Sequence, residues 1–298
     1  MNKRFLERTY RLHEVTDYIN WIYFFHAWGF SPRFASISKV HGCDVCKASW
    51  LNTFPEKEVN RATEAMQLYK EAGRMLQQLD QDYHTYSRVR LCEANADGDD
   101  LLLEDVRLPL LRQQIKKDDD PFLCLSDFVR PLSSGVKDTV GAFCSTVDNE
   151  MEYLYEKDDY KRMLVQTLCD RLAEATTEKV HEEVRRTFWG YASGEKLSID
   201  DLLIEKFQGI RPAVGYPSLP DISVNFLLDK LLDYSSIGIS LTENGMMKPH
   251  ASVSGLMFSH PQSHYFSIGK IGLDQLQDYA QRRGMNISDV QKFLAANL

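Results

Sequence analysis

The chain has 298 residues, which is enough for one large domain or two ordinary ones. Hydrophobic residues make up 43% and charged residues 26%, as in ordinary globular proteins. The formal net charge of −8 argues against a nucleic-acid-binding protein, since phosphate recognition needs a basic surface. The sequence contains no apolar run of the roughly 18 residues that a membrane span requires. Six scattered cysteines suit reduced thiols in the cytoplasm better than a disulfide framework.

The N-terminal half is expected to contain one long helix followed by strands. About residues 1–15 could be a linker or an N-terminal extension of a single domain that covers 1–298. Apolar residues recur at helical spacing from Val59 to Leu79, which predicts a helix after Pro55. Three short apolar runs then predict strands, at 101–103, 122–125 and 140–143, with a tight turn at 97–98.

The C-terminal half is expected to alternate helices and strands. An apolar stripe predicts a long helix over 159–189. Ser198 has the position of a capping residue for a short helix that Gly209 would end. Further elements are predicted as a helix at 223–232, strands at 251–259 and 265–271, and helices at 273–283 and 288–295. Because the order shows no regular βαβ period, the sequence predicts an α+β fold.

The segment 209–221 is the most unusual part of the sequence, with three prolines and two glycines in thirteen residues. Such a composition prevents regular structure and favours a rigid extended loop. Its backbone groups could meet a flat ligand, and Arg211 could hold a carboxylate. The alternative is a structural connection whose arginine forms a local salt bridge.

A second candidate binding segment follows near the C-terminus. Tyr265 and Phe266 lie after a Gly/Ser-rich stretch that ends in the loop 259–264. Aromatic rings in this setting can stack on an adenine or approach a sulfonium cation. They can equally belong to the core of a sheet.

Two histidine motifs have the residues of metal sites but incomplete patterns. His41, Cys43 and Cys46 supply at most three ligands, and no second cysteine pair follows at zinc-finger spacing. We therefore predict no metal site from the sequence. The stretch 82–87 approaches the DxHxxG pattern through which corrinoid proteins bind cobalt, but Ser87 replaces the glycine. Chance is the better explanation for His84.

Taken together, several segments resemble the activation domain of cobalamin-dependent methionine synthase. The most specific are Arg211-Pro212-Ala213-Val214-Gly215-Tyr216-Pro217 and the later stretch from Ala251 to Pro261. The other matching segments, which follow the family order along nearly the whole chain, are 18–28, 111–114, 126–129, 170–174, 189–191 and 278–280.

The resemblance implies a C-shaped α+β domain, with a twisted antiparallel sheet flanked by helices, that binds S-adenosylmethionine in a shallow groove. In that family the domain docks over cobalamin when its cobalt has been oxidised. S-adenosylmethionine then methylates the cobalt with one electron from a flavodoxin-like donor. The protein contributes positioning and electrostatics.

The resemblance also implies ligand residues. The family arginine that holds the methionyl carboxylate matches Arg211, and the backbone near Ala213 and Gly215 would hold the adenosine. A tyrosine pair matches Tyr265 and Phe266, and a helix glutamate matches Glu174.

Two positions depart from the family pattern. Asn20 replaces an aspartate that contacts the ligand, and Ile222 replaces a histidine associated with docking at the corrin. We expect the fold to survive both changes, although docking at the corrin could differ.

The sequence thus predicts a module without a complete active site. It contains no homocysteine zinc site, folate barrel or convincing corrinoid-binding motif, so cobalamin would come from a partner domain or subunit. The alternative is a free-standing, non-catalytic protein that binds corrinoid proteins or S-adenosylmethionine.

Overall fold

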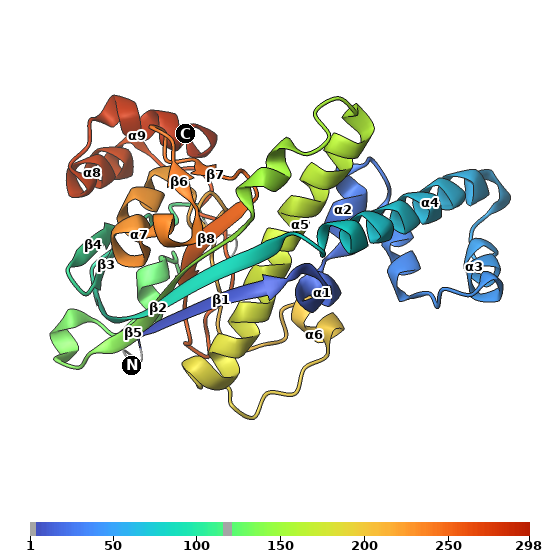
Figure 1. Cartoon of the computed structure of the whole chain (residues 1–298). Helices are drawn as coiled ribbons and strands as arrows, with labels where there is room; N and C mark the ends of the chain where they lie inside the picture. The colour runs from blue at the N-terminus through green and yellow to red at the C-terminus, as the bar shows by residue number, and fades with distance from the viewer. Residues whose placement is uncertain (1–3, 116–120) are drawn as a thin grey trace.

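The computed structural model describes residues 4–115 and 121–298 and shows helices packed on a central antiparallel sheet (Figure 1). The sheet has the order β4-β3-β2-β5-β8, with β1 paired to the first half of β2. Its strands are β1 (Phe5–Arg11), β2 (His84–Asp97), β3 (Asp100–Leu103), β4 (Val106–Pro109), β5 (Asp138–Val147) and β8 (Ser252–Met257). A separate two-stranded sheet pairs β6 (Ser240–Leu241) with β7 (Met247–Lys248).

Alternate side chains along the strands belong to two hydrophobic cores on opposite faces of the sheet. On β5, Phe143 and Val147 join one hydrophobic cluster, whereas Val140, Ala142 and Cys144 join the other. The first core lies under α5 (Asp159–Glu183), which packs against β2, β5 and β8. The second lies under α7 (Asn225–Leu232), which packs on the other face. The two-residue period of a strand thus determines both layers.

The remaining helices extend from the two ends of this sheet. At the N-terminal side are α1 (Leu12–Val15), α2 (Trp21–Ala27), α3 (Asp44–Leu51) and α4 (Glu56–Leu79). Figure 1 shows α3 and α4 projecting away from the sheet as an arm. The short α6 (Ile199–Leu203) follows α5, and α8 (Leu273–Arg283) and α9 (Ile287–Phe293) close the C-terminal end around a third small core. Within the described ranges, no helix combines the length and apolar character needed to cross a membrane.

The α+β class, with an antiparallel sheet flanked by helices, is confirmed, and so are the long helices at 56–79 and 159–183. The last predicted turn of the second helix adopts π-helical geometry over Val184–Phe188. Residues 5–11, part of the segment for which the sequence allowed a linker, pair along β2 as β1.

Three predicted elements were wrong. Residues 265–271 and 122–125 form no strand, and the helix capped by Ser198 ends at Leu203 rather than at 209. The first error has a clear cause: the free edge of β8 is already covered by the loop after Gly209. Ile210 bridges to Phe258 and Ala213 to Gly255, so the later segment finds no strand to pair with.

The close approach of this loop to β8 depends on Gly255. A Cβ atom there would lie 2.2 Å from the carbonyl oxygen of Pro212 and 2.8 Å from the Cα of Ala213. Backbone atoms cannot yield as a flexible side chain would. Glycine therefore allows the loop to lie directly on the strand.

We expect Gly255→Ala to destabilise the protein by about 1–3 kcal/mol, the usual cost of forcing extra volume into a packed site. Urea unfolding followed by circular dichroism measures the change. Gly73→Ala is the control, because a Cβ on this helix residue meets nothing within 4 Å, and alanine should raise stability by about 0.5–1 kcal/mol. Equal stability of Gly255→Ala and wild type would contradict the packing described here.

Candidate functional site

A cavity of about 740 Å³ lies between helix α5, helix α2 and the loop that covers β8. Its size is typical of sites for small ligands. Four stretches of chain and two strands of the sheet line it. The stretch around α2 contributes Tyr18, Asn20, Tyr23, His26 and Ala27, and α5 contributes Arg171, Glu174, Thr177 and Glu178. Helix α6 and the loop after it contribute Leu202, Leu203, Glu205, Arg211, Pro212, Ala213, Tyr216, Pro217 and Ser218. The C-terminal segment contributes Tyr265, Phe266 and Ser267, and the sheet contributes Phe143 and Val253.

The covering loop is fixed by backbone hydrogen bonds. The Ile210 N–H donates to the Phe258 carbonyl at 3.0 Å, and the Val214 N–H donates to the Ser254 carbonyl at 2.9 Å. The Arg211 N–H donates to the Tyr265 hydroxyl at 3.0 Å. These bonds hold the two candidate segments of the sequence against each other and against the sheet.

Arg211 is the centre of a largely buried charge network. Its Nη1 donates to Glu178 Oε1 at 3.1 Å and its Nη2 donates to Glu178 Oε2, so the pair is bidentate. The two side chains are only 15% and 6% exposed. Burial alone would lower the pKa of Arg211, but the Glu178 carboxylate raises it above its ordinary value. The guanidinium thus stays charged and points in one direction.

His181 completes this network from the next turn of α5. It is fully buried, and its Nδ1 lies 3.1 Å from Nη1 of Arg211. Burial, followed by the charges of Arg185 and Arg211, lowers the pKa of His181 well below its ordinary value. A neutral ring accepts a hydrogen bond from Arg211 at Nδ1 and carries its own proton on Nε2. That Nε2 atom has no partner among the described residues.

Two further predicted residues take part in defined hydrogen bonds at the cavity. The Tyr216 hydroxyl donates to Glu174 Oε1 at 2.7 Å. The Oδ1 of Asn20 accepts the N–H of Ile22 at 3.1 Å and caps helix α2. Asn20 therefore has a structural role, and it also lines the cavity.

The structure brings most of the sequence-predicted site together. Asn20, Glu174, Arg211 and Ala213 line the cavity, as do both aromatics at 265–266. Gly215 does not line it. Its N–H donates to the Leu219 carbonyl at 2.8 Å, and its φ of +86° forms the turn of the loop.

Three lining residues on α5 were not predicted: Arg171, Thr177 and Glu178. Arg171 and Glu178 lie on the same face of the helix as the predicted Glu174, at spacings of three and four. A polar stripe on a helix that is otherwise largely buried was the available signal. Tyr18, Tyr23 and Tyr216 were also missed as lining residues, and these tyrosines lie in the family-like segments.

His84 lies elsewhere, at the start of β2. Its N–H donates to Asp148 Oδ2 at 2.7 Å, so it takes part in a strand-end contact. His41, Cys43 and Cys46 lie on the arm, outside the cavity lining.

A sequence profile described as "Vitamin B12 dependent methionine synthase, activation domain" matches residues 11–284. The chain belongs to this family. A solved structure supports the assignment: "Crystal Structure of the MetH Reactivation Domain bound to AdoHcy" is 35% identical, with a TM-score of 0.84. The match covers 99% of this chain and 90% of that one. The cavity of this activation domain is therefore the natural place to look for a ligand.

Neutral His181 makes the stability of this activation domain depend on pH. Below about pH 6.5 the unfolded chain binds a proton at His181, whereas the folded protein keeps the ring neutral. The free energy of unfolding therefore decreases as the pH is lowered. When the pH is lowered from about 7.5 to about 5.5, this one group should reduce the free energy of unfolding by about 1.4 kcal/mol. We expect His181→Asn, whose amide oxygen can still accept from Arg211, to lose that part of the pH dependence.

Urea unfolding at the two pH values measures the effect. His264→Asn, a change at an exposed histidine, serves as the control and should behave as wild type. If His181→Asn and wild type lose the same stability on acidification, the buried histidine is not neutral in the folded protein.

Proposed function

We propose that the cavity binds S-adenosylmethionine and that the chain supports the reductive methylation that reactivates a cobalamin-dependent methionine synthase. Family membership and one further observation carry this proposal. The related reactivation domain has been solved with AdoHcy bound, and AdoHcy is S-adenosylmethionine without the transferred methyl group.

The charge of the cavity fits that ligand. Its carboxylates, from Glu174, Glu178 and Glu205, outnumber its guanidinium groups, from Arg171 and Arg211, by one. S-adenosylmethionine carries a sulfonium, an ammonium and a carboxylate, and so has one net positive charge. Lining tyrosines and phenylalanines also offer ring faces to the sulfonium or the adenine.

Arg211 has donors left for a carboxylate after its structural bonds are made. A guanidinium carries five N–H groups. Two bonds go to Glu178 and one to His181, which leaves two N–H groups for a ligand. The pairing with Glu178 fixes the direction of these donors, so little ordering is required when the ligand binds.

The other end of the amino-acid part would meet Glu174 and Asn20. The Tyr216 hydroxyl bonds one oxygen of the Glu174 carboxylate, and the other oxygen can accept from an ammonium group. The backbone at Ala213 and the rings of Tyr265 and Phe266 would hold the adenosine. Gly215 would contribute indirectly, through the turn that shapes the loop.

The methyl acceptor would be cobalamin, held by a partner domain or subunit, and a flavodoxin-like donor would supply the electron. In this scheme the chain's residues bind and orient the sulfonium, and the sulfur–methyl bond breaks to leave S-adenosylhomocysteine. The chain is then part of a methyltransferase without a complete active site of its own. Its six free cysteines agree with a cytoplasmic setting.

Arg211→Ala should weaken S-adenosylmethionine binding about ten- to hundredfold, because a charge-assisted contact is worth about 1.5–3 kcal/mol. Titration calorimetry with two ligands makes the test specific. Decarboxylated S-adenosylmethionine lacks the group that Arg211 holds, so the substitution should leave its affinity nearly unchanged.

Since Arg211→Ala also leaves the buried Glu178 without its partner, the variant Arg211→Met/Glu178→Gln serves as the matched control for folding. This double variant should also lose affinity for S-adenosylmethionine while keeping its affinity for the decarboxylated ligand. Equal losses for both ligands, or none for either, would rule out carboxylate recognition by Arg211.

Asn20→Asp should bind S-adenosylmethionine about fivefold more tightly than wild type. A carboxylate offers the ligand's ammonium group a charged hydrogen bond, worth about 1 kcal/mol more than the neutral amide. Helix capping should be unaffected, because Asp and Asn cap almost equally well. Asn20→Ser, which keeps the cap but shortens the side chain, is the control. If affinity does not rise in a folded Asn20→Asp protein, Asn20 acts only as the helix cap.

A further inference from the structure

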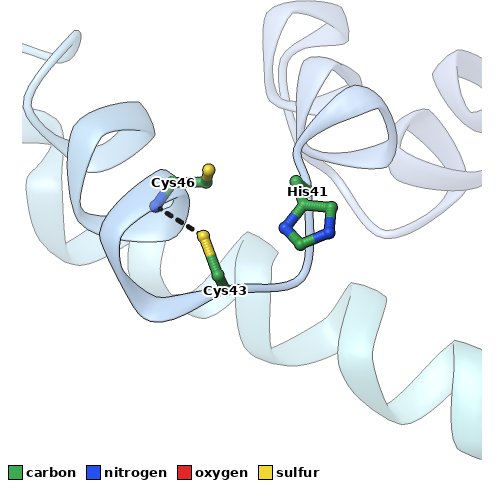
Figure 2. Close-up of side chains that lie close together, drawn as sticks. All are labelled: His41, Cys43 and Cys46. Atoms are coloured by element: carbon green, nitrogen blue, oxygen red, sulfur yellow. Dashed lines mark hydrogen bonds between the residues drawn. The ribbon is translucent and has the colours of Figure 1, made fainter.

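The arm carries a cluster of soft metal ligands that is separate from the cavity. His41, Cys43 and Cys46 lie where the chain enters helix α3 (Figure 2). Their ligand atoms all lie within 4.8 Å of one another. Across residues 4–115 and 121–298, no other group of three or more histidine, cysteine or acidic side chains meets this geometry.

Local structure explains why these three side chains converge. Cys43 is the capping residue of α3, and its Sγ accepts the N–H of Cys46 at 3.3 Å. The two cysteines are three residues apart on the first turn, so they lie on the same side of the helix. His41 precedes them in the loop, and Figure 2 shows its ring facing the same space.

We propose that this cluster binds Zn²⁺ through His41, Cys43 and Cys46, with a fourth coordination position open to water or to another ligand. Two thiolates and an imidazole form a donor set that selects zinc over magnesium or calcium. Tetrahedral zinc would place these atoms roughly 3.5–3.8 Å apart. The three side chains are at least partly exposed, so small rotations would bring their ligand atoms from the observed spacing to these distances.

The sequence supplies only three ligands, and the structure brings all three together. A three-ligand site with an open position is a recognised zinc arrangement. The other four cysteines are buried, so they do not compete for the metal. Burial raises the pKa of the Cys92 thiol to about 12 and that of Cys124 to about 11, which keeps both protonated.

The arm would gain stability from such a metal. Helix α3 has eight residues, of which Trp50 alone is buried. Val45, between the two cysteines, is 79% exposed. A metal bound at the start of α3 would join the helix to the preceding loop, at the end of the helix that lies away from Trp50.

The test uses the full chain, reduced and stripped of metal with a chelator, and titrates it with Co²⁺ as a spectroscopic substitute for Zn²⁺. We expect one equivalent to produce thiolate-to-cobalt charge-transfer bands and the intense visible bands of tetrahedral cobalt, both removed by adding Zn²⁺. Cys43→Ser and Cys46→Ser should abolish these bands. His41→Ala should weaken binding by more than the roughly 10–100-fold typical of losing a partner outside the coordination shell.

Val45→Ser is the matched control, since it places the same new side chain between the ligands and should bind metal as wild type does. Circular dichroism of each variant verifies folding. Hydrogen exchange over residues 40–51 should slow when Zn²⁺ is added to wild type and not to Cys43→Ser.

Three results would overturn the proposal. One is the absence of cobalt bands in the reduced wild-type protein. Another is the persistence of these bands in Cys43→Ser/Cys46→Ser. The third is a Cys43–Cys46 disulfide that forms in a glutathione-reduced buffer and prevents metal binding, which would identify a redox pair instead.

Discussion

The buried ion pair between Arg211 and Glu178 connects the two parts of the molecule from which the site is built. Arg211 belongs to the loop that covers β8, whereas Glu178 belongs to the long helix on the face of the sheet. Removing one partner of such a pair leaves an uncompensated buried charge and typically costs about 3–5 kcal/mol. Backbone hydrogen bonds hold the loop on β8, and this ion pair joins the same loop to α5 and fixes the direction of the guanidinium in the cavity.

The same pair organises the charges that a ligand meets. Glu178 is neutralised by Arg211, and neutral His181 adds an acceptor without adding charge. Of the described carboxylates of the lining, Glu174 and Glu205 form no ion pair with an arginine. A ligand with a carboxylate at one end and cationic groups elsewhere matches this separation. Arg211 thus forms the salt bridge that the sequence left as one alternative, and the carboxylate site that we propose would use the donors that remain.

Sequence periodicity predicted the elements that bury a regular face, such as α4 and the body of α5, because their apolar spacing reflects contacts with a core. It failed at residues 265–271, which have the composition of a strand. Strand formation there requires a free edge, and the loop after Gly209 occupies that edge. Periodicity within a segment carries no information on whether a partner strand is available.

The site shows the same limit. Arg211, Glu174 and Asn20 could be assigned from the family resemblance, since they lie in matching segments. The role of Glu178 could not, because its partner lies 33 residues away and only the fold brings them together. Convergence of His41 with Cys43 and Cys46 likewise depends on the path of the loop before α3, which the spacing of the ligands does not determine.

A crystal structure of the chain with S-adenosylmethionine would show whether the Arg211–Glu178 pair presets the binding site. We expect the ligand in the cavity between α5 and the loop, with its carboxylate on the two remaining donors of Arg211 and the bond to Glu178 intact. A ligand bound elsewhere, or an Arg211 that leaves Glu178 to reach it, would contradict the claim that this ion pair presets the site.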